Sequence, residues 1–283
     1  MVPGLSIFFM FVSAAISIGL PVVLYLAWWK KYNLKFVPLI IGAVAFLLFK
    51  GLEQIMHLFV LSPPTGGALI SVWANPALYI IYATLAAGVF EETGRFLAFH
   101  LLKKKYNGFG TGLSYGIGHG GIEAILLAGV ALVSSIIMSL MINSGNFALL
   151  VNDPSLLTQL NLIADERPVM FLASGFERVI AISVHISLSI IVWCSVRVKG
   201  KLWMYPAAVL LHAIANIAPA MYQAHLVSNI WLIEFILVIP TALIAFAAYQ
   251  VCKILRKADD DEAVLTEKSD MEAQITEDEK IEE

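Results

Sequence analysis

The sequence predicts an all-α integral membrane protein, a polytopic bundle of about seven transmembrane helices. Of its 283 residues, 59% are hydrophobic, and the mean hydropathy is +0.82, far above that of a soluble domain. Several apolar runs also exceed the roughly 20 residues that a helix needs to cross a bilayer. No soluble catalytic domain is left over, so any chemistry must be built from the membrane spans.

Short polar or Pro/Gly-rich segments separate the apolar runs and set the limits of the expected spans. These spans cover residues 4–28, 36–61, 76–102, 112–142, 168–196, 202–221 and 228–252. The fourth run is long for a single span, so we expect it to tilt, kink or protrude.

Basic residues gather at every second junction between the expected spans. They are Lys30, Lys31, Lys35, Lys103, Lys104, Lys105, Arg197, Lys199, Lys201, Lys253, Arg256 and Lys257. The alternate junctions carry a single base, Arg167. Because positive loops stay on the cytoplasmic side, the N-terminus is expected outside and the C-terminus in the cytoplasm. We therefore expect a multi-pass protein of the cell membrane, here a bacterial plasma membrane.

The chain divides into a transmembrane domain, residues 1–257, and an acidic tail, residues 258–283. The tail holds twelve of the 21 acidic residues, so the rest of the chain is basic although the net charge is −3. Few apolar residues and high like charge predict a disordered cytoplasmic tail. The two cysteines, Cys194 and Cys252, indicate neither a disulfide framework nor a thiolate metal site. The expected surroundings are the lipid bilayer, and no nucleic-acid partner is expected.

The expected spans contain an unusual number of ionisable side chains. Six glutamates and five of the six histidines lie within them: Glu53, Glu91, Glu92, Glu123, Glu177, Glu234, His57, His100, His119, His185 and His212. A charge in hydrocarbon costs at least a few kcal/mol, so such residues persist when they are paired, face a wet cavity or carry function. By their depth, Glu53 and His57 suit the outer rim of a cavity, whereas Glu234 has no evident partner.

The stretch GVFEETGRFLAFH, residues 88–100, combines two carboxylates and one cation on one expected helix. Arg95 follows Glu91 by four residues and Glu92 by three, so it can reach either carboxylate on the same helix face. One glutamate can be neutralised by Arg95 while the other stays free to take a proton. This pattern is typical of a general base in a membrane interior.

Polar residues of three expected helices fall at one depth. Counted from the cytoplasmic helix ends at about 1.5 Å per residue, Glu92, His119 and His212 each lie roughly 15 Å deep. His185 lies at roughly 18 Å, close enough to join them. The spacing therefore predicts one buried centre near the bilayer midplane.

Two of these histidines have polar partners one helical turn further along the chain. Glu123 follows His119 by four residues, and Asn216 follows His212 by four, so each pair shares a helix face. The glycines around His119, in LSYGIGHGGIEAILLAG, favour close approach of another helix or a substrate backbone.

Three short motifs resemble those of a family of intramembrane proteases. EETGR, YGIGH and HAIAN are similar, in this order, to the motifs of the CAAX-prenyl endopeptidase and bacteriocin-processing (CPBP) clan. The intervening GHGGIEA and the order of the motifs resemble more closely the YhfC branch, which is similar to PrsW-type proteases. The resemblance covers residues 76–221, the motif-bearing core.

This resemblance implies hydrolysis of a peptide bond in a membrane-embedded peptide or protein substrate. Glu91 or Glu92 would activate a water together with His119, while His212 and Asn216 would stabilise the oxyanion. The clan often places three residues between the glutamates and the arginine, and here there are two. Which glutamate is the base therefore stays open, with Glu91 favoured. Supporting roles fall to Arg95, Glu123 and His185.

Two alternatives remain open at this point. The imidazoles of His119, His185 and His212 suit a Zn²⁺ ion with one open position, which would make the protein a zinc-dependent intramembrane metalloprotease. Because no HExxH motif is present, the expectation favours no cofactor. A non-enzymatic carrier or scaffold with a polar midplane cavity would also place such residues in the spans.

Overall fold

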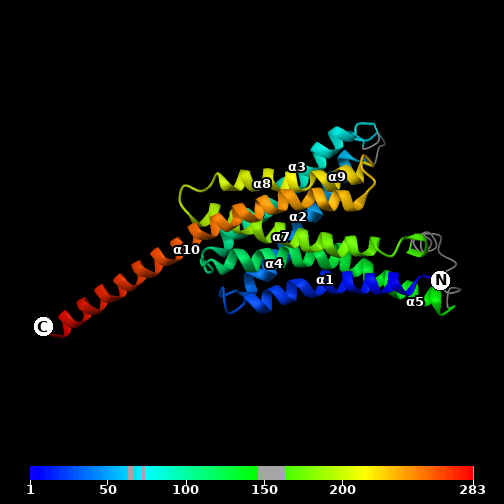
Figure 1. The fold of residues 1–283 in the computed structure, drawn as a ribbon. Helices are drawn as coiled ribbons and strands as arrows, with labels where there is room; N and C mark the ends of the chain where they lie inside the picture. Colours follow the sequence, from blue (N-terminus) through cyan, green and yellow to red (C-terminus); the bar gives the residue numbers. More distant parts are fainter. Residues whose placement is uncertain (63–66, 72–73, 146–162, 283) are drawn as a thin grey trace.

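Long helices packed side by side form the protein in the computed structural model, which describes residues 1–62, 67–71, 74–145 and 163–282 (Figure 1). Within these ranges no strand occurs. The helices are α1 (Gly4–Trp28), α2 (Phe36–Val60), α3 (Pro76–Leu102), α4 (Gly110–Ala124), α5 (Val130–Asn143), α7 (Met170–Arg197), α8 (Met204–Ala215), α9 (Ile217–Gln223) and α10 (Ile230–Glu282).

The hydropathy pattern predicted the helical regions to within a few residues, except for the C-terminal extension of α10. Among the described residues, six helical segments are long and apolar enough to cross a membrane, so this is a multi-pass membrane protein. The expected span that is not among these six is α3, whose 27 residues also suffice in length. Its buried Glu91, Glu92 and Arg95 lower its hydropathy. The count of seven spans and the orientation of the termini stay predictions.

The long fourth span departs from a regular helix. Residues 110–143 form one continuous helical rod, in which a π-helical turn, Ile125–Gly129, separates α4 from α5. A π turn adds a residue to the helical repeat and is often found near functional sites. Here it begins two residues after Glu123, so it shifts the register of α5 relative to the polar face of α4.

Helix α7 lies at the centre of the bundle. It packs against α1, α3, α4, α8 and α10, and 78% of its most apolar 18-residue window is buried inside the protein. The buried share of the corresponding window is 28% for α1 and for α2, whose outward faces carry large apolar side chains. Side chains on α7 therefore face protein on nearly every side.

Close packing of α4 against its neighbours depends on glycine. A Cβ on Gly118 would lie 1.9 Å from the carbonyl oxygen of Leu39 on α2. A Cβ on Gly116 would lie 2.7 Å from the Cα of Ile186 on α7. Because any side chain would separate these helices, the glycines hold α4 tightly between α2 and α7 and fix the position of His119 between them.

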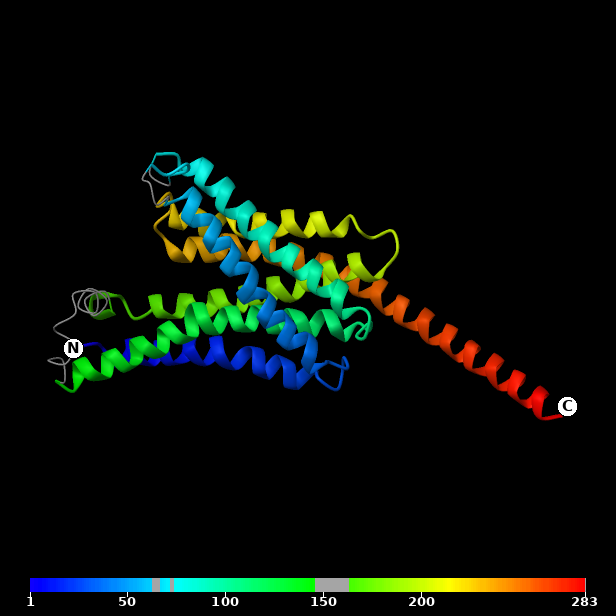
Figure 2. The same cartoon turned by 180° about the vertical axis from the view of Figure 1, so that it is seen from behind.

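Helix α10 continues far beyond its membrane-crossing part. Its helix reaches Glu282 and extends away from the bundle at the end opposite to the N-terminus (Figures 1 and 2). The sequence predicted disorder from residue 258 onward, whereas the structure has helix there. The segment is rich in Glu, which favours helix even where no packing surface is present. Its division from the transmembrane domain stays a prediction.

Candidate active site

Polar side chains from α3, α4, α7 and α8 meet in the interior of the bundle. Glu91, Glu92, Arg95, His119, His185 and His212 are each at most 5% exposed. The Glu123 side chain, which joins them, is 12% exposed. These are the residues that their depth along the chain predicted to lie together, with Glu123 and Arg95 added by their helix faces.

Glu91 lies among three imidazoles. Its Oε2 is 3.1 Å from Nε2 of His119, 3.8 Å from Nε2 of His212 and 3.9 Å from Nδ1 of His185. Its other oxygen, Oε1, is 3.7 Å from the Lys50 ammonium on α2. Side chains of α2, α4, α7 and α8 thus approach this carboxylate.

Glu92 faces a different set of partners. Arg95 donates from Nη1 to its Oε1, and Nδ1 of His212 lies 2.7 Å from the same oxygen. Nη2 of Arg95 is also 3.2 Å from Nδ1 of His185. The arginine therefore neutralises Glu92, and this fully buried ion pair holds two of the imidazole rings in place.

Side chains of α7 contact the third carboxylate of the centre, Glu123. Glu123 Oε2 is 2.5 Å from Nε2 of His185, and Glu123 Oε1 accepts from Nη1 of Arg178 at 3.0 Å. Arg178 also donates to Glu177. Oε2 of Glu123 has no partner in hydrogen-bond geometry among the described residues, although it is buried. This oxygen therefore approaches the His185 ring closely but outside regular hydrogen-bond geometry.

Four of these side chains fit a divalent metal. Glu91, His119, Glu123 and His185 each offer one ligand atom, and the four atoms lie within 4.8 Å of one another. Imidazole nitrogen and carboxylate oxygen are ligands that Zn²⁺ takes, most often four around the ion. Nδ1 of His119 and Oε2 of Glu123 are buried without hydrogen-bond partners in the described part of the chain. A cation would compensate the cost of such unpaired groups.

This set differs from the three histidines that the sequence suggested as zinc ligands. His212 lies outside it: its Nδ1 contacts Glu92, and its ring centre is 5.4 Å from that of His185. Glu123 takes its place. The i, i+4 spacing of His119 and Glu123 in the sequence was the signal for this pair.

A cavity of about 370 Å³ opens beside the centre. Glu91, Glu123, His185, His212 and Asn216 line it, so the amide that the sequence placed near His212 faces the same space. The cavity continues toward the ends of α2 and α9, where Leu61 and Gln223 line it.

The expected rim residues line this cavity in a chain of contacts. Glu53 accepts from Lys50 at 2.9 Å and lies 3.2 Å from Nε2 of His57, whose Nδ1 is 2.7 Å from the Tyr82 hydroxyl. Glu53 itself is only 2% exposed, so it is more buried than a rim position implies. Glu234 on α10 is buried and does not line this cavity.

Two contacts of the centre were missed in the sequence. Lys50 lies one turn from Glu53 on α2 and pairs with it, but its ammonium also approaches Glu91. Arg178 donates to its neighbour Glu177, but it also reaches Glu123 across 55 positions of sequence. Spacing along one helix predicts only partners on that helix, so contacts between helices left no local signal.

The fold and this centre define a polytopic α-helical membrane protein with a buried carboxylate and imidazole cluster suited to a divalent metal. The family model described as YhfC intramembrane metalloprotease matches residues 16–237, and the chain belongs to this family. The uncharacterized membrane protein YhfC of Bacillus subtilis (strain 168) is 33% identical over 261 residues, which cover 90% of this chain and 99% of the relative.

Family membership confirms the YhfC branch of the resemblance, while the wider CPBP and PrsW relationship stays a prediction. It also changes the balance between the two hydrolytic mechanisms. The family is described as metalloproteases, and the buried cluster fits a metal. The expectation of a cofactor-free, glutamate-only enzyme is therefore not supported, and the zinc-dependent alternative is favoured.

Proposed function

We propose that the protein is a zinc-dependent intramembrane endopeptidase that hydrolyses a peptide bond of a membrane-embedded peptide or protein. The observation that carries this proposal is the convergence of Glu91, His119, Glu123 and His185 on one buried point. Membership of a family described as intramembrane metalloproteases supports it.

In this proposal His119, Glu123 and His185 hold the metal. Two imidazoles and one glutamate are a known ligand set of catalytic zinc in proteases. His119 and Glu123 come from one face of α4, and His185 comes from α7, which packs against it. When bound, the metal would polarise the scissile carbonyl and acidify a water molecule.

Glu91 is the proposed general base. Arg95 forms a close ion pair with the neighbouring Glu92. The cation nearest to Glu91 is the Lys50 ammonium, which lies 3.7 Å from its Oε1. Its Oε2 lies beside His119, so it is well placed to take a proton from a water at the cluster and to return it to the leaving amine. Such a base contributes typically about 10²- to 10⁴-fold to the rate.

His212 and Asn216 are the proposed groups that bind the carbonyl of the scissile bond. Both line the cavity, one helical turn apart at the end of α8. The Asn216 amide can donate a hydrogen bond to an oxyanion in this enclosed space. Nδ1 of His212 contacts Glu92 at 2.7 Å, while its Nε2, 3.8 Å from Glu91 and beyond hydrogen-bond distance, is available to donate to the oxyanion when both ring nitrogens carry a proton.

Cleavage by the purified protein tests this function. The protein is reconstituted in liposomes with total membrane protein from a strain that lacks the gene, and new peptide N-termini are identified by mass spectrometry. We expect N-termini that lie within or beside membrane spans, that vanish with 1,10-phenanthroline and that return with added Zn²⁺.

The Glu91→Gln variant should give none of these N-termini, whereas His100→Ala should give all of them. His100 is a matched control because it is a histidine of the same helix whose Nδ1 contacts only the Phe96 carbonyl oxygen among the described groups. Products that persist in Glu91→Gln, or that resist the chelator, would refute the proposed mechanism.

A further inference from the structure

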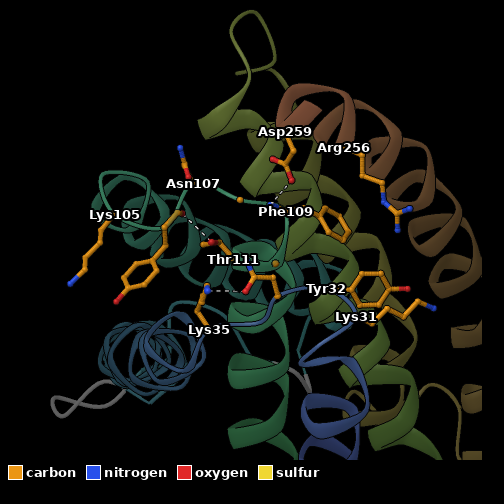
Figure 3. Close-up of a pocket in the computed structure, with 13 residues that line it drawn as sticks. Lys31, Tyr32, Lys35, Lys105, Asn107, Phe109, Thr111, Arg256 and Asp259 are labelled. Carbon is orange, nitrogen blue, oxygen red and sulfur yellow. Dashed lines mark hydrogen bonds between the residues drawn. The ribbon is translucent and has the colours of Figure 1, made fainter. Parts of the chain in front are cut away.

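A second pocket lies at the end of the bundle that carries the lysine-rich loops, far from the buried centre. The α1–α2 loop, the α3–α4 loop and α10 enclose it, and its volume is about 500 Å³ (Figure 3). Four cationic side chains line it: Lys31, Lys35, Lys105 and Arg256. Asp259 is the one carboxylate among its lining residues.

The positive charge of this pocket is not compensated by the described part of the chain. Lys35 Nζ donates to the neutral Asn33 side chain at 2.8 Å, and none of the four cations forms an ion pair there. Asp259 is itself occupied, because it pairs with Arg197 and accepts from the backbone N–H of Phe109 at 3.1 Å. The pocket thus offers an excess of positive charge to a ligand.

Aromatic rings position two of these cations. The Arg256 guanidinium lies 5.3 Å from the centre of the Phe109 ring and 5.8 Å from that of Tyr32. Lys31 Nζ lies 5.1 Å from the centre of the Tyr32 ring. Figure 3 shows Lys31 and Arg256 on either side of Tyr32. Cation–π contacts of this kind hold the charged groups without neutralising them.

The floor of the pocket is fixed by close backbone packing. A Cβ on Gly110, the first residue of α4, would lie 2.3 Å from the Tyr32 carbonyl oxygen, so only glycine permits this contact. Asn33 turns the loop with a φ of 51°, and the backbone N–H of Lys35 donates to Ser114 Oγ at 2.9 Å. The loop and α4 therefore form one rigid surface.

A second, mainly apolar groove of about 300 Å³ adjoins the pocket. It shares Tyr32, Phe109 and Arg256 with the pocket and is otherwise lined by α1, α4 and α10, at Trp28, Leu113, Tyr249, Cys252 and Lys253. These helices are membrane spans, so the groove lies along the hydrocarbon side of the charged pocket. A ligand that fills both spaces must carry an anionic group and an apolar chain.

We propose that this pocket and groove bind an anionic phospholipid. The phosphate lies among Lys31, Lys35, Lys105 and Arg256, and an acyl chain lies against Trp28 and Tyr249. Cationic pockets between helices at the basic face of a membrane protein suit lipid phosphates. The apolar groove distinguishes a lipid from free phosphate, which would fill the charged pocket alone. The proposal is independent of the proteolytic function.

Native mass spectrometry of the detergent-purified protein tests this proposal with phosphatidylglycerol as the probe. Phosphatidylcholine and inorganic phosphate are the comparison ligands. We expect one phosphatidylglycerol to be retained in preference to phosphatidylcholine, and millimolar phosphate not to displace it. Equal retention of the two lipids, or displacement by phosphate, would overturn the proposal, the second in favour of free phosphate. These comparisons use the unmodified protein, so their outcome does not depend on whether a variant folds.

A matched pair of double variants locates the site. Lys31→Gln with Arg256→Gln removes two cations from the pocket and should weaken binding about 30-fold, since each nearby cation contributes on the order of a tenfold or smaller factor. Lys103→Gln with Lys104→Gln removes the same charge from exposed positions of the same face outside the pocket. Its effect should stay below about threefold, because these two side chains do not line the pocket and salt screens their charge at a distance. Equal losses in the two double variants would contradict a defined site.

Discussion

Glu91 and Glu92 are neighbours in the sequence, but the helix turns them toward different surroundings. Glu92 forms the ion pair with Arg95 and is completely buried. Glu91 faces the cavity and three imidazoles. Arg95 is within reach of both by spacing, so the sequence left this choice open, and only the positions of α7 and α8 decide it.

The two glutamates should therefore respond differently to neutral substitution. Glu91→Gln keeps the shape of the site and should lower the cleavage rate by about 10²- to 10⁴-fold with little change in the thermal midpoint of unfolding. Glu92→Gln leaves the Arg95 charge buried and unpaired, which typically costs about 3–5 kcal/mol. Cleavage and differential scanning fluorimetry of both variants check this. Comparable unfolding of the two proteins would contradict the assignment.

Metal affinity should separate the two carboxylates that bind Arg178. Glu123 and Glu177 both accept hydrogen bonds from its guanidinium, but only Glu123 contributes to the cluster with His119 and His185. Glu123→Gln should lose bound zinc, because it replaces a charged ligand by a neutral one. Glu177→Gln serves as the control and should keep it. Elemental mass spectrometry of the purified variants measures both, and zinc retained by Glu123→Gln would exclude it as a ligand.

At the scale of elements, the position of α4 depends on how closely α2 approaches it. A Cβ on Gly42 of α2 would lie 2.2 Å from the Tyr115 carbonyl oxygen on α4. Gly51, on the same helix, has no neighbour within 4 Å of its Cβ position. The glycines of α4 are evident in the sequence as a cluster, but the sequence does not tell which neighbour each one faces.

These two glycines give a matched test of helix packing. Gly42→Ala should separate α2 from α4 and destabilise the protein by about 1–3 kcal/mol, the usual cost of overpacking. Gly51→Ala should be neutral or slightly stabilising, because alanine favours helix more than glycine does. Thermal unfolding in detergent compares them. Equal stability of the two variants would show that α2 and α4 are not packed as described.

At the scale of the whole molecule, hydropathy predicted the helices because each membrane span must be apolar along most of its length. It did not predict the extension of α10, where helix-forming residues carry too much charge to bury. The depth count brought Glu92, His119 and His212 to one level, because rise per residue is fixed in a helix. The group of side chains that could hold a metal contains Glu123 and not His212, since rotation of each helix about its axis is set by packing between helices.

The loop charges predict the orientation of the whole molecule, which can be measured directly. Fusions at the C-terminus to green fluorescent protein should fluoresce, and fusions to alkaline phosphatase should be inactive, because the C-terminus is predicted in the cytoplasm. A fusion to alkaline phosphatase at residue 1 with an exported leader should be active. The reverse pattern would place the lysine-rich loops outside and contradict the predicted topology.

We propose above all that α4 and α7 together build a zinc site in the interior of a membrane protease. X-ray absorption spectroscopy at the zinc edge of the purified protein tests it most directly. We expect about one zinc per chain, with two imidazole ligands from His119 and His185 and carboxylate oxygen from Glu123. A protein that binds no zinc when the metal is supplied, or a spectrum with three imidazoles and no carboxylate, would contradict it.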